Sequence, residues 1–265
     1  MVFTKDNKRI KDVKAWYKQI TKRVFCISDT HGYPFNKIKE MLDEVGFSER
    51  SDSLYVLGDT IDRGKNSEDI RQFLHYILRH RNVELILGNH EHMALKNACL
   101  FEKPQKSLSE LTVLEDRNYR LWMANGCETT LEMFQKMSDS ETNRILELFR
   151  EAPLYKEVCI GEQRFILCHS GLGGFDPFKP LDLYLERELT WYRPDLNERW
   201  FIDSRTMVVF GHTPTPLMDD NNQGEPIISS TWVNIDTGSA LGEGFGPCLF
   251  CLSDFSYVKH GSDVK

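Results

Sequence analysis

Six short apolar runs, each followed by a polar residue, most constrain the fold of this 265-residue chain. Their richness in Val, Ile, Leu and Phe is typical of strands that are buried on both faces. The first three runs are separated by two stretches of helical periodicity, which predicts parallel strands joined by right-handed crossovers. The runs are RVFCIS (23–28), SLYVLG (53–58), VELILG (83–88), RFILCH (164–169), MVVFG (207–211) and WVNID (232–236).

The polar residues that follow these runs are of types that bind metal ions. Ligands bind at the carboxyl ends of the strands in open α/β sheets, so we expect these side chains to gather at one mouth. Glycines beside them let the backbone leave each strand sharply. Asp236 ends the sixth run and need not be a ligand. The candidate ligands are Asp29, His31, Asp59, Asn89, His169 and His212.

A cluster of this composition predicts bound metal, because burying several carboxylates and imidazoles together is costly unless a cation compensates them. Two aspartates, one asparagine and three histidines are too many ligands for a four-coordinate zinc site. They suit two divalent ions that share a bridge, for which Asp59 is the natural carboxylate. Mixed oxygen and imidazole ligands favour Mn, with Fe or Zn as alternatives, over Mg or Ca.

Three residues beside the ligands supply the other parts needed for phosphate-ester hydrolysis. His90 follows Asn89 directly, and on an extended chain it would point away from the metal and towards the substrate. Asp62 is placed to orient that imidazole and to raise its pKa. Arg63 offers a planar fork for two phosphate oxygens. A metal would lower the pKa of water towards neutrality, and an acid would protonate the leaving oxygen.

At these residues the sequence resembles the calcineurin-like metallophosphoesterases, and within them the phosphoprotein phosphatases of the bacterial and bacteriophage lambda branch. The shared motifs run from SDTHG through GDTIDRG, GNHE, HSG, TWYRP and GHTP to IDTGS, in the family's order. WMANGCETT (122–130) is similar to a family segment near the substrate cleft. Ser28 stands where many members have glycine, and HSG, where animal-type phosphatases have HGG, marks the bacterial branch.

The resemblance implies an α/β fold, a sandwich of two mixed β-sheets flanked by helices. It also implies a two-metal centre with a bridging hydroxide as the nucleophile. The ligands of one ion would be Asp29, His31 and Asp59, and those of the other Asp59, Asn89, His169 and His212.

The same resemblance assigns catalytic roles to four further residues. His90 would be the general acid and Asp62 its partner. Arg63 and Arg193 would hold the phosphate group of the substrate.

Three functions remain open at this point. The one we favour is a serine/threonine protein phosphatase acting on phosphoproteins or phosphopeptides. The second is a symmetrical diadenosine tetraphosphatase, whose dinucleoside polyphosphate substrate would need stacking residues such as Trp122, Trp191 or Tyr192. The third is an inactive protein-binding scaffold, which would be expected to lose His90 or a ligand, and none of these is missing.

Charge is distributed unevenly along the chain. Residues 1–23 carry a net charge of +6, which leaves −13 for the rest of a chain whose total is −7. The acidic body argues against a nucleic-acid polymer as partner, because phosphate backbones need cationic neutralisation. The basic N-terminal segment indicates a solvated helix around DVKAWYKQI.

We predict one metallophosphoesterase domain over residues 1–265, a size that buries a single large core, and a monomer. Residues 91–150 are predicted to be almost wholly helical, as an insertion that forms a lobe beside the active face. No apolar run approaches the ~18 residues that span a bilayer. Seven cysteines without a disulfide framework favour a reducing, cytoplasmic location.

Overall fold

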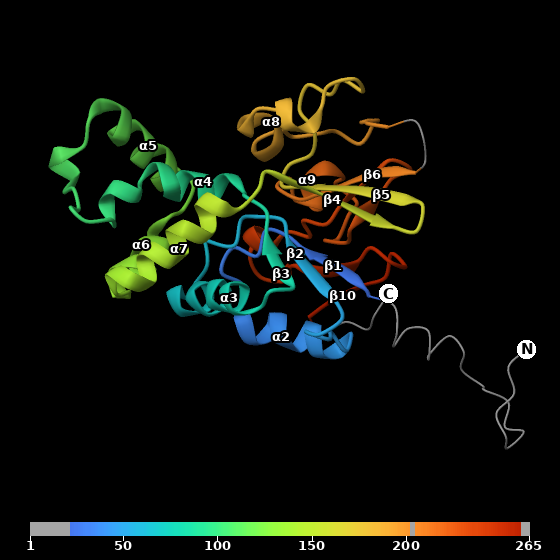
Figure 1. The fold of residues 1–265 in the computed structure, drawn as a ribbon, viewed down its shortest axis with the longest axis horizontal. Helices are drawn as coiled ribbons and strands as arrows, with labels where there is room; N and C mark the ends of the chain where they lie inside the picture. Colours follow the sequence, from blue (N-terminus) through green and yellow to red (C-terminus); the bar gives the residue numbers. More distant parts are fainter. Residues whose placement is uncertain (1–21, 202–204, 261–265) are drawn as a thin grey trace, which may run out of the picture.

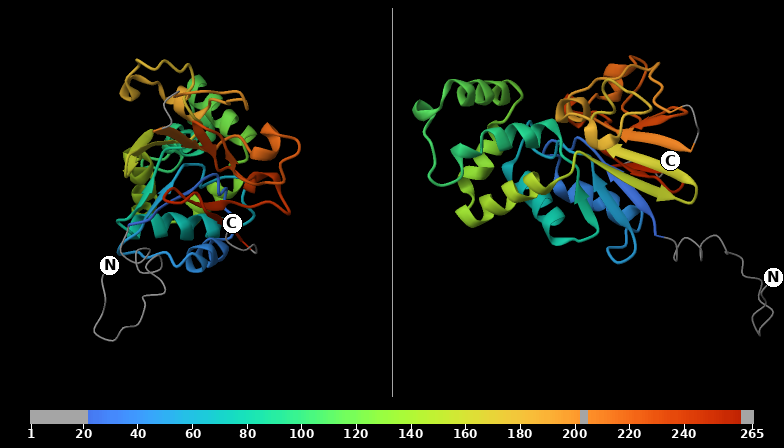
Figure 2. Two further views of the ribbon diagram at one scale, coloured as in Figure 1. Left: turned by 90° about the vertical axis from the view of Figure 1, so that its right-hand side faces the viewer. Right: turned by 45° about the horizontal axis from the view of Figure 1, so that its top comes forward.

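The computed structural model describes residues 22–201 and 205–260, which form two five-stranded sheets with helices outside them (Figures 1 and 2). Apart from its last two residues, the basic segment 1–23 lies outside the described residues, as does the helix expected within it. All six predicted strands are present. The predicted fold, a sandwich of two mixed sheets flanked by helices, is confirmed.

The first sheet has the strand order β10–β9–β1–β2–β3. Its β1, β2 and β3 are parallel, as the alternation of strands and helices predicted, while β9 and β10 are antiparallel additions at one edge. The strands are β1 (Val24–Ile27), β2 (Ser53–Val56), β3 (Val83–Leu85), β9 (Cys248–Cys251) and β10 (Tyr257–Lys259).

The second sheet has the order β4–β5–β6–β8–β7. Its three central strands are parallel, and each edge strand pairs with its neighbour in the antiparallel sense. The strands are β4 (Tyr155–Ile160), β5 (Gln163–Cys168), β6 (Thr206–Phe210), β7 (Ile227–Ile228) and β8 (Trp232–Asn234).

The alternation of side chains along β1 shows how the layers pack. Phe25 and Ile27 lie in the core between the first sheet and its helices. Val24 and Cys26 point the other way, into a second core that they share with β5, β6 and β8. Because successive side chains of a strand point to opposite faces, a strand between two such cores must be apolar throughout. This accounts for the unbroken apolar runs in the sequence.

Helices α2 and α3 cover the outer face of the first sheet, below it in Figure 1, and α8 lies outside the second sheet. Helices α4–α7 form the predicted helical block at one end of the sandwich, although residues 97–112 contain only short 3₁₀ turns. That residues 1–265 form one domain, with this block as an insertion, stays a prediction. The helices are α2 (Phe35–Glu44), α3 (Ser67–Arg79), α4 (Asn89–Lys96), α5 (Val113–Ala124), α6 (Glu128–Lys136), α7 (Asp139–Glu151), α8 (Glu186–Thr190) and α9 (Thr215–Met218).

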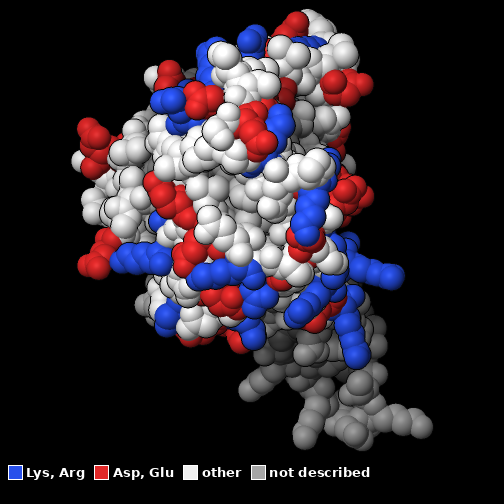
Figure 3. All heavy atoms as spheres, turned by 90° about the vertical axis from the view of Figure 1, so that its left-hand side faces the viewer, with Lys and Arg blue, Asp and Glu red and all other residues white. Residues whose placement is uncertain are grey.

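The surface of the helical block carries charges of both signs. Figure 3 shows lysines and arginines interspersed with aspartates and glutamates on this face, without one continuous basic surface. In the described ranges, no helix combines the length and the apolar character needed to cross a membrane.

Candidate active site

The predicted ligands meet where strands of both sheets end, with Asp59 at the centre. Asp59 Oδ2 lies 3.3 Å from His169 Nε2 and 3.7 Å from His31 Nε2. The same Nε2 of His169 is 2.9 Å from Asn89 Oδ1 and 3.2 Å from His212 Nδ1. The sequence-predicted cluster is therefore brought together within one buried site.

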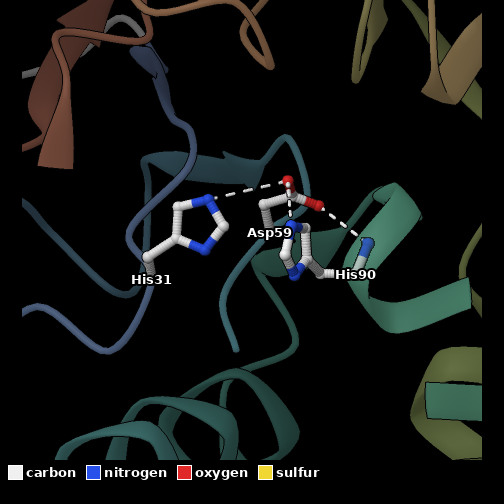
Figure 4. A group of neighbouring side chains, drawn as sticks. All are labelled: His31, Asp59 and His90. Atoms are coloured by element: carbon white, nitrogen blue, oxygen red, sulfur yellow. Dashed lines mark hydrogen bonds and ion pairs between the residues drawn. The ribbon is translucent and has the colours of Figure 1, made fainter. Parts of the chain in front are cut away.

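Two groups of buried side chains are close enough together to hold a metal ion. One contains His31, Asp59 and His90, and the other contains Asp59, His169 and His212. Asp59 belongs to both groups, which is the position that a bridging ligand requires. Figure 4 shows the first group, in which the rings of His31 and His90 approach the same carboxylate from a loop and from helix α4.

Asp29 lies beside these groups and is held by the backbone. Its Oδ2 accepts hydrogen bonds from the His212 amide, at 2.9 Å, and from the Ser28 hydroxyl. Ser28, the position where the sequence departs from many family members, therefore contacts a predicted ligand. Asp236 is buried nearby, and burial followed by the charge of Asp29 raises its pKa well above the usual value.

The protonation of the histidines fits a metal. His31 Nδ1 donates to Ile61 O at 2.9 Å, and His169 Nδ1 donates to Leu57 O at 2.7 Å. In the His31 ring the other nitrogen, Nε2, is left to face Asp59 with its lone pair. A backbone carbonyl on one nitrogen is the usual way in which proteins fix a histidine in the tautomer that binds metal.

The charges within the site also call for a cation. Burial and the neighbouring His90 lower the pKa of His31 to about 3, so this ring is neutral and able to ligate. His169 behaves differently: burial would lower its pKa, but the carboxylates of Asp59 and Asp29 raise it to about 10. The two buried carboxylates thus favour a positive charge at His169, and a divalent ion beside this ring would supply it.

His90 is paired with Asp62, as the sequence predicted, but it reaches the site differently. The expectation of an extended chain at His90 is wrong, because residues 89 and 90 begin helix α4. Its side chain does not turn away from the cluster: Nδ1 donates to Asp62 Oδ2 at 2.5 Å, and Nε2 lies 3.7 Å from Asp59 Oδ2. Burial would lower the pKa of His90, but Asp59 and Asp62 outweigh it and raise the pKa.

The helical block holds the Asp62 carboxylate through both ends of the segment WMANGCETT. Trp122 Nε1 donates to Asp62 Oδ2 at 2.7 Å, and Thr130 Oγ1 donates to Oδ1 at 2.5 Å. Trp122 is fully buried, so its suggested role as a stacking residue for substrate is wrong. Trp191 and Tyr192 are half-buried, and the Trp191 ring lies edge-on to His212. The indirect role of Trp122 and Thr130 was missed at the level of the sequence.

The two predicted arginines lie at different ends of the cluster. Arg63 Nη1 is 3.3 Å from His31 Nε2, and its Nε donates to Asn125 O at 3.2 Å. Arg193 is exposed and donates through Nη1 to His212 O at 3.2 Å. One guanidinium therefore stands beside each candidate metal group.

Glu91 is a further buried residue of the site that sequence reasoning did not single out. Its carboxylate accepts hydrogen bonds from the amides of Asp59, at 2.9 Å, and of Thr60, at 2.7 Å. It also accepts from the Gly88 amide, as the third residue of helix α4. The only sequence signal was a glutamate three residues after the glycine at which the helix begins.

Most of the predicted site residues adopt left-handed backbone conformations, which non-glycine residues rarely do. Such residues are strained by roughly 1–3 kcal/mol each and cluster at functional sites. The approach of neighbouring backbone is equally tight, since a Cβ at Gly88 would lie 2.3 Å from Asp59 Oδ1. The residues with φ between +44° and +68° are Asp29, His31, Asp59, Asp62, Arg63 and His212.

The sequence profile of the family described as "Calcineurin-like phosphoesterase" matches residues 22–231, most of the chain. This chain belongs to that family. The calcineurin-like phosphoesterase described here is thus a metallophosphoesterase with a buried site of histidines and aspartates.

Relatives of this calcineurin-like phosphoesterase carry two kinds of name. Serine/threonine-protein phosphatase 2 of Escherichia coli (strain K12) is 25% identical over 226 residues, which cover 82% of this chain and 88% of that protein. The asymmetrical bis(5'-nucleosyl)-tetraphosphatase PrpE of Halalkalibacterium halodurans is 24% identical over 242 residues, with coverages of 82% and 85%. A crystal structure of a proposed diadenosine tetraphosphatase superposes with a TM-score of 0.58 at 17% identity, covering 90% of this chain and 93% of that one.

Proposed function

We propose that this calcineurin-like phosphoesterase is a serine/threonine protein phosphatase that works with two divalent metal ions. The observation that carries the proposal is the His90–Asp62 pair, whose free imidazole nitrogen faces the carboxylate shared by both candidate metal groups. A proton donor in that position can serve the leaving oxygen of a phosphate ester.

The residues proposed to hold the metals are those that surround Asp59. Bound divalent ions would lower the pKa of water and polarise the phosphoryl oxygens. The mixed donor set favours Mn, with Fe or Zn as alternatives. The proposed ligands are Asp29, His31 and Asp59 for one ion, and Asp59, Asn89, His169 and His212 for the other.

His90 is proposed to be the general acid. Because its Nδ1 proton is held by Asp62, the acidic proton is the one on Nε2, on the side of the cluster. Asp59 and Asp62 raise the pKa of His90, which favours the protonated form that a proton donor needs.

Arg63 and Arg193 are proposed to hold the phosphate between them. Each guanidinium stands beside one candidate metal group and presents several N–H donors to phosphate oxygens. The exposure of Arg193 favours a mouth that admits a phosphorylated side chain carried by a large protein.

Similarity to the Escherichia coli phosphatase over 82% of the chain supports a phosphoprotein or phosphopeptide as the substrate. A dinucleoside tetraphosphate is the second candidate, supported by the similarity to PrpE and by a cavity beside Arg63.

The cysteines, none of which is disulfide-bonded, support a reducing, cytoplasmic location. We propose a monomer.

The proposal is tested by steady-state hydrolysis with metal-stripped protein to which Mn²⁺ is restored. A phosphothreonine peptide and diadenosine tetraphosphate are compared side by side. Faster turnover of the peptide by orders of magnitude would support a protein phosphatase, and preference for the dinucleotide would support the second candidate. If neither reacts with two metals bound, the proposed catalytic function fails.

A further inference from the structure

An ion pair joins helix α4 to helix α8 beside the candidate active site. His92, on the first turn of α4, contacts the carboxylate of Glu186 at the start of α8 through its Nδ1. The two helices belong to different halves of the sandwich, since α4 follows β3 of the first sheet and α8 lies outside the second sheet, above α4 in Figure 1. None of the proposed catalytic steps uses this pair.

The Glu186 carboxylate is held by a second contact within α8. The hydroxyl of Thr190, a fully buried residue, donates to Glu186 Oε1 at 2.8 Å, so that His92 and Thr190 share one oxygen. Burial would raise the pKa of Glu186, but the hydrogen bonds from His92 and Thr190 outweigh it and lower the pKa. The group is therefore an ionised carboxylate at neutral pH, held at both helices.

The two helices carry different parts of the proposed catalytic centre. Helix α4 begins with Asn89 and His90, a proposed metal ligand and the proposed acid. The chain leaves α8 at Trp191, whose ring lies edge-on to His212, and two residues later it reaches Arg193, which is proposed to hold the phosphate. The ion pair between α4 and α8 thus links the proposed proton donor to one of the two phosphate-holding guanidiniums.

Helix α8 depends on its contacts because it is short. It has only five residues, and a helix of this length is not stable on its own in water. Its C-terminal end is anchored to the second sheet, where the Ser170 amide, next to His169, donates to Leu189 O at 2.9 Å. Its N-terminal end is anchored to α4 through Glu186. Without this second anchor the helix would be free to tilt about the first.

We propose that Glu186 and His92 are positioning residues, which set the distance between His90 on α4 and Arg193 beyond α8. A phosphate ester has to be held by Arg193 and to present its leaving oxygen to His90 Nε2 at the same time. A misplacement of about 1 Å can lower a reaction rate about 10²-fold, so a small shift between the helices would matter. The inference rests on the proposed function, because it uses the proposed roles of His90 and Arg193.

The test compares two phosphate esters in the Mn²⁺-loaded full chain. Phenyl phosphate has a basic leaving oxygen that needs a proton, whereas p-nitrophenyl phosphate releases a stabilised phenolate that needs it less. Partial loss of folded protein lowers both rates equally, so the ratio of kcat/KM for phenyl phosphate to kcat/KM for p-nitrophenyl phosphate reports the alignment with the acid. We expect Glu186→Ala and His92→Ala to lower this ratio by about threefold to tenfold, within the range of coupling between contacting residues.

Lys179→Ala is the matched control. Lys179 Nζ lies 2.8 Å from the carboxylate of Glu188, also on α8, and these side chains are 24% and 22% exposed, against 22% and 28% for His92 and Glu186. The control pair joins α8 to the loop that precedes it instead of to α4, so Lys179→Ala should leave the ratio unchanged. Because His92 and Glu186 act through one contact, the double alanine variant should have the same ratio as Glu186→Ala alone.

The second readout is the calorimetric affinity for inorganic phosphate, which needs no turnover. Displacement of Arg193 in Glu186→Ala and His92→Ala should weaken phosphate binding by about twofold to fivefold, the scale of one partly screened ionic contact. Lys179→Ala should bind phosphate as the unaltered protein does.

Failure of the inference and failure of the proposed function are distinguishable. In an active protein, an unchanged ratio in Glu186→Ala and His92→Ala, an equal change in Lys179→Ala, or effects that add in the double variant would overturn the positioning role alone. A protein that hydrolyses neither ester but shows the expected pattern of phosphate binding would support the positioning of Arg193 while refuting the proposed catalytic function. Absence of both hydrolysis and phosphate binding would overturn both.

Discussion

Replacing Trp122 by phenylalanine would test whether the helical block supports the acid–base pair. The change removes the indole N–H that Trp122 donates to Asp62 Oδ2 at 2.7 Å and keeps an aromatic ring against Phe101. Asp62 is fully buried, and among the described residues His90 and Thr130 are then its remaining side-chain donors. The substitution therefore removes one defined contact to the carboxylate.

The expected loss of stability follows from the charge of the Asp62 carboxylate that accepts this hydrogen bond. A hydrogen bond to a charged group contributes about 1.5–3 kcal/mol to stability. The smaller ring also leaves a cavity, and this part of the cost must be separated from the hydrogen bond. Trp200→Phe provides the comparison, because Trp200 is equally buried but its indole N–H has no partner within the described parts of the chain.

The measurement is urea unfolding of both variants with metal chelated, so that metal binding does not contribute to the free energy of unfolding. We expect Trp122→Phe to be less stable than Trp200→Phe by about 1.5–3 kcal/mol. For an m value of about 2–3 kcal/mol/M this separates the two midpoints by roughly 0.5–1.5 M urea. Turnover with Mn²⁺ restored should fall about tenfold in Trp122→Phe, less than the ~10²–10⁴ expected for loss of the acid itself.

Equal midpoints for the two variants would refute the reasoning, since the loss of ring volume alone would then explain both. Unchanged turnover at full metal occupancy would show that the Trp122 contact is structural and does not support His90.

Three further predictions concern the centre itself. His90→Asn should leave both metals bound, as measured by elemental analysis, and cut turnover about 10²–10⁴-fold; loss of metal would mean that His90 is a ligand. Asp59→Asn should weaken both metal sites together, because Asp59 belongs to both groups, and loss of one ion alone would contradict a bridging role. Asp62→Asn should move the alkaline limb of the pH–rate profile to lower pH. Asp59 and Asp62 hold the pKa of His90 up, a general acid stops working above its pKa, and removing the Asp62 charge lowers that pKa; a limb that stays in place would exclude His90 as the acid.

The clustering of the proposed ligands could be predicted from the sequence because each lies within a few residues of an apolar run. Once Asp29, Asp59 and His169 are placed at the ends of strands in one sandwich, their convergence follows from the topology. The helical start at Asn89 could not be predicted in the same way. Its N-cap is Gly88, which has no side chain to signal a cap, and the backbone turns immediately after a strand.

Contacts across long stretches of sequence were also beyond prediction. Trp122 and Asp62 are 60 residues apart, and Thr130 is 68 residues from Asp62. A hydrogen bond over such a distance has no periodic or local pattern, and a tryptophan in an amphipathic helix is usually part of the core.

The edge strand β10 (Tyr257–Lys259) was also not predicted. It is three residues long and is defined by its pairing with β9, so its own sequence gives little indication of a strand.

The left-handed backbone at six of the predicted site residues implies that activity and stability compete in this protein. At roughly 1–3 kcal/mol for each such residue, the strained positions together amount to a sum similar to the whole stability of an ordinary domain. A laboratory selection for heat resistance alone, blind to turnover, would accumulate glycine or asparagine at these positions. The most heat-stable variants would retain the two-sheet fold and lose catalytic activity.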